Sequence, residues 1–366
     1  MNYSVTHLTS AHPRYDTRIF LKECISLTKN YEVNLIVADS LGNEKKNNVS
    51  IYDVGVEKGR LGRILKTTKK VLAKAIELDS DIYHLHDPEL IPIGLKLKKL
   101  GKKVIFDAHE DLPKQVMAKH YLNTWSKNIL SFSISKVEIW TLEKFDAVVA
   151  ATPIIRDKFL FHKIKSIDIN NFPILDELID IKPNFNKPTI CYIGLLYETR
   201  GIREIIQAIE NLDVKLILAG RFFDKEFENK IRVLKGWKKV DFRGFANRED
   251  VKAILEASAV GLVTLHPTPS YIEAYPVKMF EYMSAGIGVI ASNFPLYKKF
   301  IEDNKCGICV DPMDSKAIEK VIQDMMDNLN ATQKMGIKGK DIVKYQYNWY
   351  IEEQKLFKLY EDLLND

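Results

Sequence analysis

The chain has 366 residues, of which 46% are hydrophobic and 28% charged, a composition typical of a globular protein rather than a disordered or fibrous one. At about 150 residues per domain, this length predicts two domains. No apolar run approaches the ~20 residues that span a bilayer, no secretory leader is recognisable, and four cysteines are too few for a disulfide scaffold, so we expect a cytoplasmic protein.

The net charge of +5 is distributed unevenly along the chain. Residues 1–170 hold 27 of the 54 basic and 20 of the 49 acidic residues, which gives this part +7 and leaves −2 for the remainder. Segment 58–74, KGRLGRILKTTKKVLAK, contains seven basic residues, no acidic one and an apolar helical face. Such a helix could bind an anionic membrane, assisted by the aromatic segment 120–140, or could be a solvated helix whose apolar face joins the core.

In chain order, short runs rich in Val and Ile alternate with amphipathic helical patterns. Strands are predicted in the first half at 4–9, 32–37, 81–86, 103–107 and 147–151. The pattern restarts after the Pro-rich stretch 173–188, with strands at 189–193, 215–219, 240–242, 260–265 and 288–291 and helices from Arg200, from Arg248 and from Asp314. This alternation predicts βαβ units and an α/β fold of two doubly wound domains.

The predicted boundaries follow from this restart. The expected division is an N-terminal domain at 1–172, a linker at 173–188, a second domain at 189–344 and a C-terminal helix at 345–366 that packs back toward the N-terminal domain. Ligands of such sheets bind at the carboxyl ends of the strands. Two domains of this kind that face each other are expected to hold their site in the cleft between them.

The stretch IEAYPVKMFEYMSAG, residues 272–286, carries Glu273 and Glu281 eight positions apart. Pro276 is typical of a helix start and Gly286 of a helix end. A glycosidase acid and nucleophile would need a separation of roughly 5–9.5 Å, whereas eight helical residues rise by ~12 Å. The spacing therefore favours two contacts on one long ligand over an acid/base pair.

Lys278 lies in the first turn of this predicted helix. A helix N-terminus binds anions through its free N–H groups and its dipole, and that dipole disfavours a nearby cation. The lysine is therefore expected either to face a phosphate or to form a surface pair with Glu281.

These motifs resemble the retaining GT-B glycosyltransferases of family 4. The E-x7-E helix, which runs into MSAG and then a VIAS strand, is joined in the same order by HPRYDTRIFLKECISL, DIYHLHDPEL, VIFDAHEDLP, IGLLYETRGIREIIQAI and NKCGICVDPMD. The resemblance covers nearly the whole chain. It implies the GT-B fold, in which an acceptor-binding and a nucleotide-sugar-binding Rossmann-like domain face each other across a cleft.

Donor contacts carry over by position from this resemblance. Glu273 would hold hydroxyls of the donor sugar, His109 would contact that sugar from the other domain, and these two are the expected catalytic residues. Glu281 would accept hydrogen bonds from the ribose, with Gly194 and Arg200 at the diphosphate. Leu195 stands where the family has a phosphate-binding arginine, so the candidates to replace it are Lys278, Arg221 and Arg243.

The loop after the first strand is expected to face the acceptor. It contains His12, Arg14 and Asp16, while Arg18 could equally serve packing inside the domain. The resemblance implies retention of anomeric configuration, with the leaving phosphate taking the acceptor proton, so no general base is assigned.

No metal and no cofactor are expected, because GT-B enzymes stabilise the leaving diphosphate without a bound ion. The D-x-D at 79–81 precedes its strand, where a turn is expected, and the C-x-x-C at Cys306 and Cys309 reads as a buried strand. His84 and His86 alternate on a strand and could form a metal pair, line the cleft floor or hydrogen-bond locally.

The predicted activity is transfer of a hexose or N-acetylhexosamine from a nucleotide sugar, expected to be UDP-linked. The implied acceptor is a lipid-linked sugar of O-antigen, lipopolysaccharide or capsule-type polysaccharide synthesis, at the inner face of the cell membrane. A nucleotide-sugar 2-epimerase of the same fold is the alternative. A nucleic-acid-binding role for segment 58–74 is disfavoured, because it lacks interleaved aromatics or a recognised binding module.

Overall fold

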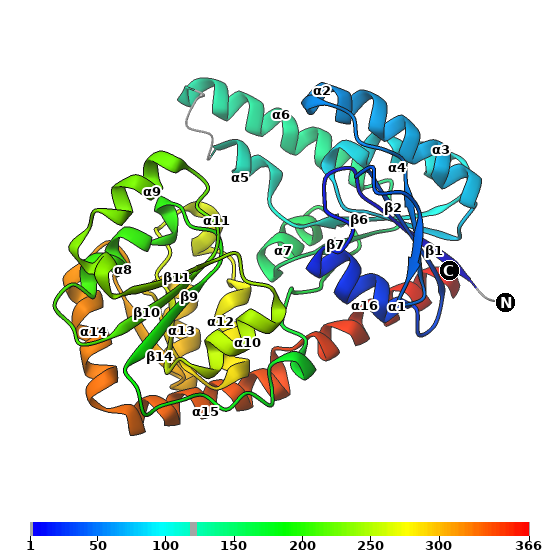
Figure 1. Cartoon of the computed structure of the whole chain (residues 1–366). Helices are drawn as coiled ribbons and strands as arrows, with labels where there is room; N and C mark the ends of the chain where they lie inside the picture. The colour runs from blue at the N-terminus through cyan, green and yellow to red at the C-terminus, as the bar shows by residue number, and fades with distance from the viewer. Residues whose placement is uncertain (1–2, 118–122, 366) are drawn as a thin grey trace. The chain divides into compact units, whose positions relative to one another are not determined.

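A computed structural model describes residues 3–117 and 123–365 (Figure 1). The chain divides into two compact units: unit 1 comprises Met1–Asn171 and Trp349–Asp366, and unit 2 comprises Phe172–Asn348. Among the described residues, no helix is both long and apolar enough to cross a bilayer.

Unit 1 is built on an eight-stranded sheet of order β3-β4-β2-β1-β5-β6-β7-β8, in which every pairing is parallel except that of β3 with β4. The strands are β1 Ser4–Leu8, β2 Glu32–Val37, β3 Glu44–Lys46, β4 Val49–Asp53, β5 Ile82–Leu85, β6 Lys103–Ala108, β7 Ala147–Ala150 and β8 Ser166–Asp168. The central strands are almost wholly buried, as expected for a parallel sheet covered on both faces.

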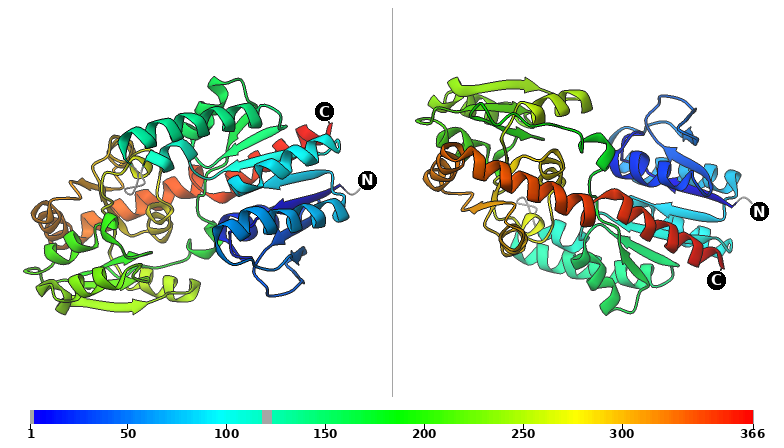
Figure 2. Two further views of the ribbon diagram at one scale, coloured as in Figure 1. Left: turned by 90° about the horizontal axis from the view of Figure 1, so that it is seen from above. Right: turned by 90° about the horizontal axis from the view of Figure 1, so that it is seen from below.

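Helices cover the sheet of unit 1. They are the π-helix η1 Thr17–Cys24, α1 Ile25–Leu27, α2 Gly59–Gly62, the π-helical η2 Arg63–Thr67, α3 Thr68–Leu78, the 3-10 turn η3 Pro88–Leu90, α4 Ile91–Lys99, α5 Leu112–Met117, α6 Thr124–Leu142, α7 Pro153–Phe161 and α16 Trp349–Asn365. The last helix, drawn in red in Figure 2, is tied to this unit by specific bonds. Trp349 Nε1 donates to Ser26 Oγ at 2.9 Å, and Glu352 accepts from the Asn170 amide at 2.8 Å.

Unit 2 holds a six-stranded sheet of order β11-β10-β9-β12-β13-β14, parallel throughout. Its strands are β9 Thr189–Ile193, β10 Lys215–Ala219, β11 Val240–Gly244, β12 Val260–Val263, β13 Gly288–Ser292 and β14 Gly307–Val310. The helical elements are η4 Leu175–Glu177, η5 Glu198–Arg200, α8 Ile202–Ala208, α9 Lys225–Arg232, η6 Lys235–Lys239, α10 Arg248–Glu256, α11 Pro269–Ile272, α12 Val277–Ala285, α13 Pro295–Asn304, α14 Ser315–Asp327 and α15 Leu329–Gln346.

Two glycines bring backbones together at the carboxyl edge of the unit 2 sheet. A Cβ at Gly220 would lie 1.8 Å from the carbonyl oxygen of Gly194, and one at Gly201 would lie 2.0 Å from that of Thr264. Both glycines also have positive φ, which other residues rarely adopt. The loops after β9, β10 and β12 therefore meet at one edge, where the site residues lie.

Candidate active site

The donor-side residues predicted from the sequence gather at the carboxyl edge of unit 2. Helix α12 begins after Pro276 and ends at Gly286, whose φ of 82° forms a left-handed cap. Gly194 follows β9 directly, and Arg200 ends the short turn η5. The fold thus brings together Gly194, Arg200 and the N-terminal turn of α12.

Lys278, in the first turn of α12, has a buried ammonium group. Nζ lies 3.8 Å from the centre of the Tyr192 ring, and a Cβ at Gly194 would be 2.9 Å from it. Nζ donates a hydrogen bond to none of the described residues. Burial, with Arg200 nearby, holds the pKa of Lys278 well below its ordinary value. Of the two alternatives for Lys278, the surface pair with Glu281 is not formed; the ammonium points inward toward Gly194.

Arg200 stands in an aromatic cradle close to Lys278. Its Nε donates to the Tyr197 hydroxyl at 2.9 Å, and its guanidinium carbon lies 4.7 Å from the Tyr271 ring centre. No carboxylate among the described residues pairs with it. Two cations thus share this edge, neither of them in an ion pair with a carboxylate of the described residues, beside the N–H groups of a helix start, which is the arrangement that binds phosphate.

The two glutamates of the E-x7-E motif have different surroundings. Glu273 caps α11 and is half-buried, in a loop whose carbonyls at Tyr271 and Ala274 both accept from the buried Tyr297 hydroxyl, at 2.7 and 2.9 Å. Glu281 accepts from Arg248 Nη1 at 2.8 Å. Tyr297 therefore fixes the loop on both sides of Glu273, and Arg248 holds Glu281.

Leu195 stands where the family has a phosphate-binding arginine, and three basic residues were candidates to take over that role. Arg221 stacks on Phe245, with its guanidinium carbon 4.7 Å from the ring centre, and Arg243 pairs with Asp241 at 2.8 Å. Of these three, Lys278 alone has a buried charged atom that makes no hydrogen bond or ion pair with the described residues. The geometry favours Lys278 as the second cation.

In unit 1, a cavity of about 230 Å³ lies at the carboxyl ends of β5 and β6. Its lining includes His12, His86, Asp87, Asp107 and His109. His109 Nε2 lies 3.2 Å from Asp107 Oδ2, and the His12 and His109 rings are 5.0 Å apart between centres. The fold thus places His109 and His12 in one polar cavity.

The other acceptor-side residues in the loop after β1, Asp16 and Arg14, differ in their contacts. Asp16 caps η1 by accepting from the amides of Arg18 and Ile19, and it raises the pKa of the neighbouring His12. Arg14 is buried, with ion pairs to Asp39 at 2.6 Å and to Glu44 at 2.5 Å. Arg14 does not line the cavity, so its contacts support the local packing of unit 1.

Arg18 packs inside unit 1. The sequence had left open whether it faces the acceptor or packs inside the domain. It binds both oxygens of Asp107, at 2.8 and 2.9 Å, and donates to the carbonyl of Ile169 at 2.7 Å. The bidentate pair fixes the carboxylate that His109 contacts.

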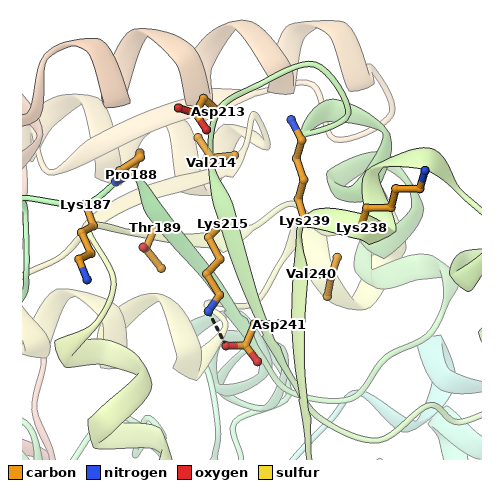
Figure 3. A pocket seen from close by; sticks show the side chains of 10 residues that line it. All are labelled: Lys187, Pro188, Thr189, Asp213, Val214, Lys215, Lys238, Lys239, Val240 and Asp241. Carbon is orange, nitrogen blue, oxygen red and sulfur yellow. Dashed lines mark ion pairs between the residues drawn. The ribbon is translucent and has the colours of Figure 1, made fainter.

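A larger hollow of about 700 Å³ lies at the opposite edge of the unit 2 sheet. Figure 3 shows its lining at the first residues of β9, β10 and β11, with Lys187, Lys215, Lys238 and Lys239 among them. Lys215 is paired with Asp241 at 2.8 Å. Because ligands of parallel sheets bind at the carboxyl edge, this hollow is not the candidate donor site.

Sequence reasoning missed the aromatic residues of the donor edge. Tyr192, Tyr197, Tyr271 and Tyr297 enclose the two cations or pin the loop near Glu273. Tyr271 and Tyr275 flank Glu273 in YIEAY, a local signal that could have been used. No local sequence pattern pointed to Arg248, because it lies 33 residues before Glu281, which it contacts.

Solved structures with the same architecture identify the class. Sucrose-phosphate synthase from Thermosynechococcus elongatus matches with a TM-score of 0.80 at 16% identity, over 100% of both chains. Anabaena Alr3699/HepE in complex with UDP and glucose matches with a TM-score of 0.75 at 15% identity, over 99% of this chain and 100% of that one. The two units have the GT-B fold.

Sequence comparisons name the family. Residues 176–342 match the glycosyl transferases group 1 model, and residues 24–169 match the glycosyltransferase family 4 model. The phosphatidyl-myo-inositol mannosyltransferase of Mycobacterium leprae is 19% identical over 299 residues, which cover 78% of this chain and 74% of the relative. The chain belongs to the group 1, family 4 glycosyltransferases.

Proposed function

We propose that the protein is a retaining, metal-independent glycosyltransferase that moves a hexose or N-acetylhexosamine from a UDP-sugar to a lipid-linked sugar acceptor. The observation that carries the donor assignment is the buried ammonium of Lys278, which has no hydrogen-bond acceptor among the described residues. A buried charge without a partner is costly, and a diphosphate would supply the missing acceptor. The solved complex of Anabaena Alr3699/HepE with UDP supports UDP as the nucleotide.

The proposed chemistry follows from where charge develops during transfer. As the bond from the sugar to the diphosphate breaks, negative charge grows on the leaving phosphate, and fixed positive groups stabilise that state most. Lys278, Arg200 and the amides that open α12 would supply them. Glu273 would hold hydroxyls of the donor sugar, Glu281 would hold those of the ribose, and His109 would contact the sugar as the family resemblance implies. The leaving phosphate would take the acceptor proton.

The test of this assignment is a donor-and-acceptor assay with the full chain. Incubation with UDP-, GDP- and dTDP-sugars and a polyprenyl-linked sugar acceptor should give product from a UDP-sugar, with the anomeric configuration of the donor kept in the NMR spectrum. The variant Glu273→Ala should lose about 100-fold or more in rate while its thermal unfolding is unchanged. Undiminished transfer by the folded variant would contradict the role of Glu273.

Incubation with the UDP-sugar alone distinguishes the transferase from the alternative epimerase. A nucleotide-sugar 2-epimerase would isomerise the UDP-sugar without any acceptor, whereas a transferase leaves the sugar configuration at C2 unchanged. Isomerised donor in this arm would replace the transferase assignment by the epimerase.

We also infer that unit 1 binds an anionic membrane surface, where a lipid-linked acceptor would be found. The helical segment 59–67 leaves Leu61 74% exposed and Leu65 exposed, and it carries Arg60 and Lys66. Neither Arg60 nor Lys66 has an ion-pair partner among the described residues. Exposed leucines beside unpaired cations are the pattern of a helix that lies in a membrane interface. The lipid acceptor named for the mycobacterial relative supports this location.

Helix α6 adds an aromatic surface in the same unit. Trp125 is 76% exposed, and further large apolar side chains on α6 are exposed: Ile129, Leu130, Phe132, Val137 and Trp140. Lysines accompany two of the aromatics, since Lys144 Nζ lies 3.0 Å from the Trp140 ring centre and Lys136 Nζ 5.6 Å from that of Phe132. Tryptophan beside lysine is favoured at lipid headgroups. The exposed face of α6 therefore supports membrane binding.

Co-sedimentation with lipid vesicles tests the membrane inference. The full chain should pellet with vesicles containing phosphatidylglycerol and not with pure phosphatidylcholine, and salt should weaken the binding because headgroup attraction is screened. The double variant Leu61→Ser/Leu65→Ser should bind less. Phe161→Ser, which alters an exposed aromatic on α7 of the same unit, is the matched control. Equal binding of both variants would contradict this surface.

A further inference from the structure

Unit 1 contains a cluster of buried polar side chains that the proposed transfer reaction does not use. His7 on β1 and His84 on β5 are register partners in adjacent strands, and His86 follows β5 on the same face. Glu23 from η1 packs against this face, as does Tyr360 from α16. These five side chains are at most 2% exposed.

The nitrogen and oxygen atoms of this cluster converge. Glu23 Oε2 lies 3.7 Å from His7 Nδ1, 3.9 Å from His84 Nδ1 and 3.8 Å from His86 Nε2. His7 Nδ1 and His86 Nε2 are 2.9 Å apart. One ligand atom from each of the four residues lies within 4.8 Å of every other.

The three histidines have hydrogen-bond partners, but Glu23 does not. A chain of contacts runs from His84 to Tyr360 at 2.8 Å, from Tyr360 to His7 at 3.2 Å and from His7 to His86 at 2.9 Å. Neither carboxylate oxygen of Glu23 accepts a hydrogen bond from a described residue, and His84 Nε2 also has no partner among them.

Arg18 does not complete the bonding of Glu23. Its Nε lies 3.1 Å from Glu23 Oε1, but the Nε–H group donates to Asp107 Oδ2 at 2.8 Å. Glu23 and Asp107 are two buried carboxylates that share this one arginine, so their ionised forms leave one negative charge uncompensated. Buried carboxylates without hydrogen bonds are costly, and this one is aimed at three imidazoles.

We propose that His7, Glu23, His84 and His86 bind a divalent transition-metal ion, with zinc the ion that three imidazoles and one carboxylate suit best. Zinc takes imidazole nitrogen at 2.0–2.1 Å and carboxylate oxygen at 2.0–2.2 Å in a tetrahedron, so its ligand atoms lie about 3.4 Å from one another. Four of the separations in the cluster, from 2.9 to 3.9 Å, bracket this value, and all of them lie within 4.8 Å. The ion would add the positive charge that the second carboxylate requires.

Groups around the cluster would orient its ligands. His86 offers Nε2 to the cluster while its Nδ1 lies 3.3 Å from Asp107 Oδ2, and His7 offers Nδ1 while its Nε2 lies 3.2 Å from the Tyr360 hydroxyl. A ligating histidine commonly donates its other N–H to a carboxylate or another oxygen, which fixes the tautomer. Glu23 is carried by a π-helix, a distortion that recurs at functional sites.

The role of this ion is structural. It would join β1, β5 and η1 inside unit 1, and no step of the proposed sugar transfer passes through it. The inference goes beyond the proposed function and departs from the expectation of a metal-free chain, in which His84 and His86 were a conceivable metal pair.

Metal analysis of the purified full chain tests the site. After expression with zinc and removal of loose ions by gel filtration, elemental analysis should find one zinc per chain, and Glu23→Gln should lose it. Replacement by Co²⁺ should give the intense visible absorption of a tetrahedral site, without the sulfur charge-transfer band that cysteine ligation would produce. The control is His162→Ala, an exposed histidine outside the cluster, which should keep its zinc.

Two results would overturn the proposal. One is a wild-type chain that holds no zinc, shows no tetrahedral Co²⁺ spectrum and has the same melting temperature with and without Zn²⁺. The other is zinc retained in full by Glu23→Gln. Because the wild-type measurements need no variant, the proposal stays testable even where Glu23→Gln fails to fold.

Discussion

The two units treat a buried cation in opposite ways. In unit 1, the buried guanidinium of Arg18 is matched by Asp107 in a bidentate pair. In unit 2, the buried ammonium of Lys278 faces an aromatic ring and a glycine, with Arg200 as a second cation nearby. A cation that is paired inside its own unit stabilises the fold. A buried cation without an acceptor indicates a binding site for an anionic ligand.

The largest effect should come from the paired cation of unit 1. Arg18→Met leaves Asp107 buried beside Glu23 without its partner, and we expect a loss of about 3–5 kcal/mol in the free energy of unfolding. Denaturant unfolding of the variant and wild type measures it. A variant as stable as the wild type would show that Asp107 is not held as an ionised partner.

The same type of substitution in unit 2 should have the opposite sign. Lys278→Met removes a buried charge that has no acceptor and replaces it with an apolar side chain of similar length. We therefore expect a gain of about 1–3 kcal/mol in the free energy of unfolding. For a unit of this size, each kcal/mol raises the melting temperature by about 2–4 °C. Destabilisation of the ligand-free protein would mean that Lys278 is compensated within the fold.

The pH dependence of stability sharpens the comparison. Burial, together with Arg200, lowers the folded-state pKa of Lys278 well below the ordinary value of 10.5. Between these two pKa values the unfolded chain binds more protons, so stability should rise with pH across that window. Below the folded-state pKa both states are protonated and the full penalty remains. The difference in stability between wild type and Lys278→Met should therefore shrink as pH approaches 10.5, which thermal unfolding at several pH values measures.

The smallest effect is expected where unit 2 does pair its charges. Arg248 holds Glu281 at 2.8 Å in a half-exposed pair, for which solvent screening leaves at most about 1 kcal/mol. Arg248→Ala should therefore raise the KM for the UDP-sugar by about fivefold or less and leave kcat unchanged. Arg243→Ala, which breaks the exposed pair with Asp241, is the control and should change neither constant. A fall in kcat for Arg248→Ala would contradict a pure positioning role.

The main strands could be predicted because their patterns are local. The ranges 32–37, 189–193 and 215–219 match β2, β9 and β10 at both ends, since buried parallel strands read as continuous apolar runs. Strands β3 and β4 were missed because NEKKNNVSIYD is short and largely polar. The predicted buried strand at Cys306 and Cys309 is confirmed in part: β14, Gly307–Val310, contains Cys309 but begins after Cys306 and is mostly half-buried, and both cysteines are free.

The candidate site could be predicted in its residue types but not in its contacts. Helical periodicity placed Lys278 and Glu281 on one surface, yet Tyr192 and Gly194, more than 80 residues earlier, provide the space that draws the lysine inward. The burial of Arg14 depends on Asp39 and Glu44, which lie in a loop and a short strand that no pattern connected to it. Such contacts are set by tertiary packing.

The central claim is that the Lys278 ammonium binds the diphosphate of the donor. Isothermal titration of UDP into wild type and Lys278→Met tests it most directly. We expect UDP to bind the wild type, because its diphosphate supplies the acceptor that the buried ammonium lacks. Lys278→Met should bind UDP about 100-fold more weakly although it is the more stable protein. Equal affinity for UDP in both chains would contradict the claim.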